Sequence, residues 1–281
     1  MSEASVNRID GIFAELRESN RRALMPFVCG GHPSLGATEA MLPAIAEAGG
    51  SIIEVGVPFS DPIADGPVIA SAMHETLQAG VTLSALFERI ARVRERTDAG
   101  LVAMASVSLA HACGGAGDFA TRVRDAGFDG LIVPDVPLEE CGELREAAGA
   151  AGLTLSLLVA PTTPPPRAAE IAKACTGFVY LLARSGVTGE QKKPPKIAET
   201  VARLRDATDL PIACGFGISD AEQVRAVTAD ADAAIVGSAL VRRLSEAGAD
   251  RAAKVAADFT RELARGLTAA APGDQASEAV G

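Results

Sequence analysis

Short apolar runs recur along the chain at regular intervals, and amphipathic stretches separate them. The runs cover residues 24–29, 52–57, 101–107, 130–134, 153–160, 178–182, 211–214 and 233–236, and their length predicts strands. The stretches between them predict helices over residues 37–48, 83–96, 118–126, 139–150, 167–174, 197–207 and 219–227. This alternation predicts an α/β fold, a (β/α)8 TIM barrel whose catalytic groups lie at the C-terminal ends of the strands. A doubly wound open sheet is the alternative.

The two ends of the chain differ from this alternation. Ile9, Ile12, Phe13 and Leu16 are spaced as one face of a helix, which predicts an extra N-terminal helix across the bottom of the barrel. Residues 268–281 are small and polar, and they predict a disordered tail. Because no repeat or second block is evident, we expect residues 1–267 to form a single domain.

One predicted strand contains an acid, and the loop that follows it contains two more. Glu54 interrupts the apolar run 52–57, while Asp61 and Asp65 lie on the proline-rich loop after it. A carboxylate inside a strand needs a partner or a substrate to offset the cost of burial. An exposed acid or a buried ion pair is the ordinary explanation for one such residue. Three acids within twelve residues favour a catalytic site.

Glycine-bearing turns follow the last three predicted strands. They cover residues 184–189, 215–219 and 237–240. In a barrel these turns converge, and their backbone N–H groups, with Ser238 at the start of a helix, predict a phosphate site. The stretch 184–196 combines glycine, lysine and proline and is expected to be either a lid or a solvated surface loop.

Charge and composition exclude several classes of function. A net charge of -10 argues against nucleic acid or an anionic membrane as a partner. No apolar run is long enough to span a membrane and the start lacks a signal peptide pattern, so we expect a cytoplasmic protein. The five cysteines are dispersed and the three histidines do not cluster, which predicts neither a disulfide framework nor a metal site.

With these residues in place, the chain resembles the tryptophan synthase alpha chain family from about Arg8 to Leu244. The matching segments are 53–67 (IEVGVPFSDPIADGP), 134–140 (PDVPLEE), 180–189 (YLLARSGVTG), 215–218 (GFGI) and 236–238 (VGS). The resemblance implies a (β/α)8 barrel that cleaves indole-3-glycerol phosphate by a retro-aldol step to indole and glyceraldehyde 3-phosphate. It further implies a heterotetramer with a pyridoxal-phosphate beta chain, and no cofactor or metal in the alpha chain itself.

The resemblance also implies roles for individual residues. Glu54 would be the general acid/base and Asp65 would hold the indole N–H, while Asp61 would face the beta chain. The expected substrate contacts are Phe27, Ile69, Tyr180 and Phe216 around the substrate, Thr188 and Gly189 in the closing loop, and Gly189, Gly217, Gly237 and Ser238 around the phosphate. For Phe27 and Phe216, ordinary core packing is the competing interpretation.

The sequence departs from the family pattern at the rim. Residues 104–115 replace a segment that resembles Tyr-Tyr-Asn-Pro in the family, and Cys29, His32 and Ala70 stand where Thr, Asp and Gln are usual. These departures leave open a stand-alone lyase that supplies free indole to another pathway. A non-catalytic regulatory subunit and a different phosphate-binding barrel enzyme, such as an isomerase, are weaker alternatives.

Overall fold

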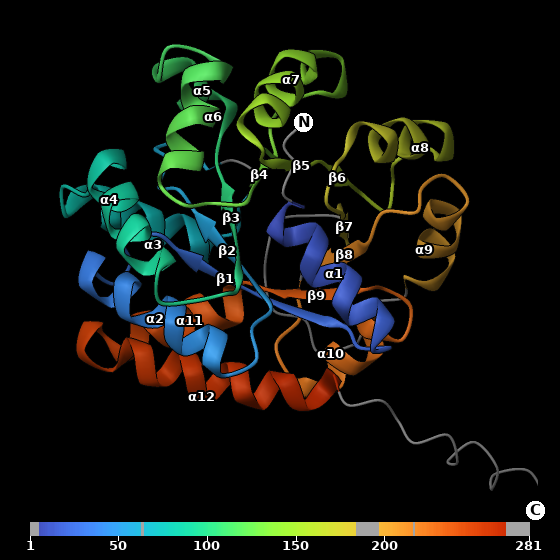
Figure 1. The fold of residues 1–281 in the computed structure, drawn as a ribbon. Helices are drawn as coiled ribbons and strands as arrows, with labels where there is room; N and C mark the ends of the chain where they lie inside the picture. Colours follow the sequence, from blue (N-terminus) through green and yellow to red (C-terminus); the bar gives the residue numbers. More distant parts are fainter. Residues whose placement is uncertain (1–5, 63–64, 184–196, 216, 268–281) are drawn as a thin grey trace, which may run out of the picture.

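The predicted eight strand positions form a parallel barrel surrounded by helices (Figure 1). The computed structural model describes residues 6–62, 65–183, 197–215 and 217–267. The strands are β1 (Ala23–Cys29), β2 (Ile52–Gly56), β3 (Gly100–Met104), β4 (Gly130–Ile132), β5 (Thr154–Ser156), β6 (Leu158–Val159), β7 (Val179–Leu182), β8 (Ile212–Gly215) and β9 (Ala233–Val236). Their order is β5-β4-β3-β2-β1-β9-β8-β7-β6. Only Leu157 separates β5 from β6, so these two short strands are halves of the predicted fifth strand. The TIM barrel is confirmed, and the open sheet is excluded.

The strand register stacks the side chains inside the barrel in layers. Following the paired residues once round the barrel from Glu54 returns to β2 displaced by eight residues, which is the shear of a TIM barrel. Side chains at one height therefore come from alternate strands. From the base upward the layers are Ile52, Gly130, Phe178 and Ala233; Met25, Val102, Ser156 and Ala213; Glu54, Ile132, Tyr180 and Ile235; and Phe27, Met104, Leu158 and Gly215. Glu54 thus lies inside the barrel, in its third layer.

Helices surround the barrel, and all the outer helices except α12 lie in the predicted sequence positions. The outer helices are α2 (Leu35–Glu47), α4 (Leu83–Arg94), α6 (Ala116–Asp125), α7 (Gly142–Ala151), α8 (Pro165–Ala174), α9 (Ala198–Arg205), α10 (Ala221–Thr228) and α12 (Ala252–Ala264). Three further helices follow strand ends: α3 (Pro67–Gln78) after β2, α5 (Val107–Ala112) after β3 and α11 (Ser238–Ala247) after β9. The prediction that the third strand reaches residue 107 was wrong, because β3 ends at Met104 and Ser106 caps α5 by accepting a hydrogen bond from Ser108 N.

The predicted extra helix closes the base of the barrel. In Figure 1, α1 (Arg8–Glu18) lies across one end of the strands. Ile9 is fully buried, and the rings of Phe13 and Phe178 lie 6.0 Å apart. A Cβ on Gly100 would lie 2.5 Å from Ile9 Cδ1, so the absence of a side chain there lets the helix pack directly on β3.

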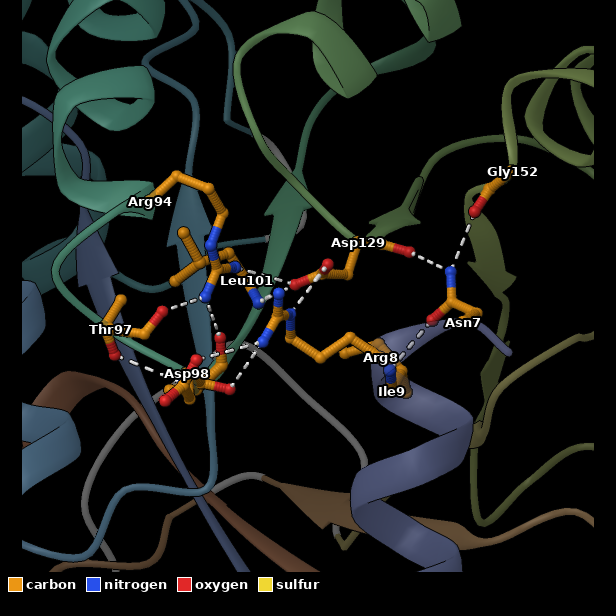
Figure 2. Close-up of polar contacts among 10 residues, drawn as sticks. Asn7, Arg8, Ile9, Arg94, Thr97, Asp98, Leu101, Asp129 and Gly152 are labelled. Atoms are coloured by element: carbon orange, nitrogen blue, oxygen red, sulfur yellow. Dashed lines mark hydrogen bonds and ion pairs between the residues drawn. The ribbon is translucent and has the colours of Figure 1, made fainter. Parts of the chain in front are cut away.

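A network of hydrogen bonds and ion pairs connects the start of α1 to the base of the barrel. Asp129 accepts hydrogen bonds from Arg94 Nη1 at 3.0 Å and from Leu101 N at 2.9 Å, and Arg8 Nε lies 3.5 Å from its other oxygen (Figure 2). Asn7 caps α1 and also donates to the carbonyls of Asp129 and Gly152. The base is thus held by a partly buried acid that has its partners within the fold.

The structure leaves the predicted ends of the domain untested. Residues 268–281, read as a tail, lie outside the described residues, so the single domain over 1–267 stays a prediction. Among the described residues, no helix combines the length and the hydropathy needed to cross a membrane.

Candidate active site

Glu54 is a buried acid whose carboxylate has no internal partner. The alternation along β2 directs Ile53 and Val55 outward and Glu54 into the barrel. Glu54 is 0% exposed, and neither carboxylate oxygen has a hydrogen-bond partner among the described residues. Burial, and then the nearby charge of Asp65, raises the pKa of Glu54 to about 8. An isolated buried acid with such a shift is typical of a catalytic group.

Asp65 lies above Glu54, on the loop between β2 and α3. Its backbone N–H donates to Pro62 O at 3.0 Å, which fixes the turn. Burial raises the pKa of Asp65 to about 6. The acid lines a small cleft with Met73 and Met104. At neutral pH, Asp65 is therefore mainly ionised while Glu54 is mainly protonated, and such a separation allows two carboxyl groups to take different chemical roles.

Tyr180 shares the third layer with Glu54. Its pKa is raised well above its ordinary value by burial and by the charge of Glu54. A Cβ on Gly215 would lie 2.7 Å from Tyr180 Oη. The glycine thus leaves room for the phenol to reach the upper layer of the barrel.

Phe27, Ile69 and Gly237 lie together at the upper end of the barrel. A Cβ on Gly237 would lie 3.7 Å from both Phe27 Cβ and Ile69 Cδ1, and a Cβ on Gly56 would collide with the tip of the Phe27 ring at 2.5 Å. Phe27 is 3% exposed and packs with Ile69 in an apolar cluster next to the β9–α11 turn. Core packing and contact with a bound molecule are both compatible with this position.

The turns after β8 and β9 supply backbone donors at the same end. Gly217 has φ +81°, a conformation that favours glycine. Ser238 is the first residue of α11 and follows Gly237 directly, so the first N–H groups of this helix lack carbonyl partners within it. These groups suit an anion such as phosphate. Within the described part of the chain, no group of His, Cys, Asp and Glu residues is arranged to hold a metal ion.

The structure does not place every predicted site feature. Thr188, Gly189 and Phe216 lie outside the described residues, as does the predicted lid or surface loop. Asp61 is exposed and accepts a hydrogen bond from Ser60 Oγ at 2.8 Å. Although it lines the same cleft as Asp65, it is on the outer rim.

The sequence reasoning missed the role of Asp135. Its carboxylate accepts hydrogen bonds from Ser106 Oγ at 2.6 Å and from Val107 N at 2.9 Å, and it borders the cleft of Asp65. It therefore holds the start of α5 against the mouth of the barrel. Its position directly after the apolar run 130–134 was the available signal, because an acid after a parallel strand faces the same end as the other candidates.

Comparisons with known proteins agree on one family. The model of the family described as "Tryptophan synthase alpha chain" matches residues 13–271. The chain is 43% identical to the tryptophan synthase alpha chain of Cyanothece sp., over 91% of this chain and 96% of the relative. It is 39% identical to that of Geobacter sulfurreducens, over 92% and 98%.

Solved structures give the same result. A chain of Mycobacterium tuberculosis tryptophan synthase matches with a TM-score of 0.85 and 34% identity, covering 95% of this chain and 100% of that one. A chain of the Pyrococcus furiosus tryptophan synthase complex matches with a TM-score of 0.79 and 31% identity, covering 87% and 98%.

Proposed function

From the premise that the chain belongs to the tryptophan synthase alpha chain family, we infer that its barrel is a lyase that cleaves indole-3-glycerol phosphate to indole and glyceraldehyde 3-phosphate in tryptophan biosynthesis. The observation that carries this proposal is Glu54, an acid buried inside the barrel with both oxygens unpartnered among the described residues. A group that costs this much to bury is retained where a substrate supplies its partner.

The two shifted carboxyl groups account for the chemistry. Protonated Glu54 gives its proton to the indole ring carbon that bears the glycerol chain, and the ring nitrogen becomes positively charged. Ionised Asp65 accepts the N–H and stabilises that charge. Glu54, now a carboxylate, takes the proton of the adjacent hydroxyl as the carbon–carbon bond breaks. The electron pair returns to the ring, an aldehyde forms on the leaving fragment, and Glu54 ends protonated as it began.

The remaining site residues position the substrate. Phe27, Ile69 and Tyr180 enclose the ring and the glycerol chain, with Phe216 as a further wall. The N–H groups at Gly217, Gly237 and Ser238 hold the phosphate, and Thr188 and Gly189, which lie outside the described residues, are proposed as further substrate contacts. Phosphate held by backbone donors is compatible with the net charge of -10, since helix and turn dipoles supply the attraction.

The partner in this proposal is a pyridoxal-phosphate beta chain, in a heterotetramer of two alpha and two beta chains. The Pyrococcus furiosus relative was solved as a tryptophan synthase complex, and the exposed Asp61 lies at the mouth of the barrel where a partner would receive indole. A cytoplasmic location belongs to the same proposal. Family membership does not favour a stand-alone lyase or a non-catalytic subunit.

Indole release tests the proposal directly. The purified chain is incubated with indole-3-glycerol phosphate, alone and with a beta chain, and indole is measured. We expect release that increases with the beta chain and disappears in Glu54→Gln, while Glu143→Gln, an exposed acid on α7, leaves it unchanged. Equal release with and without the beta chain would favour the stand-alone lyase, and no indole in any mixture would overturn the lyase proposal for this substrate.

A further inference from the structure

A second unpartnered polar group lies inside the barrel, one layer below Glu54. Ser156 on β5 is 0% exposed, and its Oγ has no hydrogen-bond partner among the described residues. Its neighbours along the strand, Leu155 and Leu157, belong to the cluster between the barrel and the outer helices. Ser156 therefore points inward. A hydroxyl buried without a partner costs free energy, so its position requires an explanation.

The register places Ser156 beneath the catalytic layer. Pairing of β3, β4 and β5 aligns Ser156 with Ile132 and Met104. With the shear of eight residues, Ser156 shares the second layer with Met25, Val102 and Ala213, directly under the layer of Glu54. Ser156 and Ala213 are the two smallest side chains of this layer. Both stand on the side of the barrel opposite β2, so the second layer is least filled on that side.

The chemistry of the two groups fits one bridging water molecule. Buried water in proteins typically makes two to four hydrogen bonds to polar groups that otherwise lack partners. Ser156 Oγ and the Glu54 carboxyl are such groups, and they lie in adjacent layers. A hydroxyl both donates and accepts, so the bridge can form with Glu54 ionised or protonated.

We propose that Ser156 is a positioning residue, which holds the carboxyl group of Glu54 through a water molecule buried in the second layer of the barrel. Its part in catalysis rests on the proposed function, whereas the bridge itself does not. Hydrogen bonds to a charged group are stronger than those to a neutral one. The bridge therefore favours the carboxylate, and its loss raises the pKa of Glu54.

Titration of Glu54 in the absence of substrate tests the bridge. The carbonyl band of the protonated acid is followed against pH by difference infrared spectroscopy and assigned by its loss in Glu54→Gln. In Ser156→Ala we expect the midpoint to rise by about half to one pH unit. Thr154→Val is the matched control, because Thr154 Oγ1 is also buried and unpartnered but lies two residues nearer the base. That variant leaves the midpoint unchanged.

Kinetics separate positioning from a structural role. In Ser156→Ala the pH profile of kcat/KM, which reports the free enzyme, moves by the same amount as the midpoint, with KM nearly unchanged. An unchanged midpoint in Ser156→Ala, or an equal shift in Thr154→Val, overturns the proposal. If the midpoint rises but no variant or wild-type chain releases indole, the bridge stands and the proposed function fails. If indole is released but the midpoint does not shift, the proposed function stands and the bridge fails.

Discussion

The base of the barrel contains a partly buried carboxylate and the middle a fully buried one, and the two differ in their hydrogen-bond partners. Asp129 at the base accepts hydrogen bonds from Arg94 and Leu101 N and lies beside Arg8 (Figure 2). Glu54 is more deeply buried and has no partner among the described residues. A buried acid that stabilises a fold needs its donors in place, whereas an acid that acts on a substrate must keep its oxygens available. The pattern of partners, and not burial alone, separates the two roles.

The largest effect is expected from removing the proton transfer of Glu54. Glu54→Gln keeps the shape of the side chain but cannot exchange a proton, so indole release falls by about 10²–10⁴-fold. The unfolding free energy is not lowered, because Glu54 has no hydrogen-bond partner among the described residues to lose. Parallel measurements of indole release and of chemical unfolding check both statements. A variant that unfolds more easily would place Glu54 among the structural acids.

The opposite result is expected at the base. Asp129→Ala leaves Arg94, whose side chain is 17% exposed, without its carboxylate and Leu101 N without an acceptor. The unfolding free energy then falls by about 1–3 kcal/mol. The turnover of the folded fraction stays near the wild-type value. Asp98→Ala is the matched control, because Asp98 is fully exposed and lies 3.4 Å from Arg8. We expect this variant to keep near wild-type stability, since exposed ion pairs contribute little.

The pH dependence of stability tests the burial of the Glu54 carboxyl group. The pKa of Glu54 is about 8 in the folded chain and near its ordinary value of 4.5 when unfolded. Between these values the unfolded chain binds fewer protons, so stability falls as pH rises, by up to about 1.4 kcal/mol per pH unit. Above about pH 8 this contribution is constant. Unfolding curves of the wild type and Glu54→Gln at several pH values give the difference in unfolding free energy between them. This difference would not change with pH if Glu54 had its ordinary pKa in the folded chain.

The architecture was largely predictable from the sequence, because periodicity reports which face of each element is buried. Seven outer helices and all strand positions follow from it. The exception near residue 107 has a physical reason. Residues 104–107 are small or apolar and continue the run of β3, but Ser106 caps a helix and Asp135 holds its start. That contact joins two segments far apart in the chain, and no local pattern contains it.

The candidate site was less predictable from the sequence than the architecture. Glu54 stood out because an acid is costly in an apolar strand, and the structure places it inside the barrel as expected. Its lack of partners depends on what the opposite strands present, which periodicity does not specify. Ser156 illustrates the same limit. From the sequence alone, a serine in an apolar run is interpreted as a tolerated small residue. Only the strand register shows that Ser156 lies in the layer beneath that of Glu54.

The smallest effect is expected at Asn7, a polar residue directly before α1. Its Oδ1 accepts from Ile9 N at 2.8 Å, and its Nδ2 donates to Asp129 O and Gly152 O. Asn7→Ala removes the cap and both bridges, so the unfolding free energy falls by about 1–2 kcal/mol. Val6→Ala, next to it and 76% exposed, has no such effect. In Asn7→Asp the cap oxygen remains while the two donors are lost. If the cap alone matters, Asn7→Asp keeps wild-type stability. If the hydrogen bonds to Asp129 O and Gly152 O hold α1 to the base, it is destabilised like Asn7→Ala. Indole release per folded molecule is unchanged in both variants.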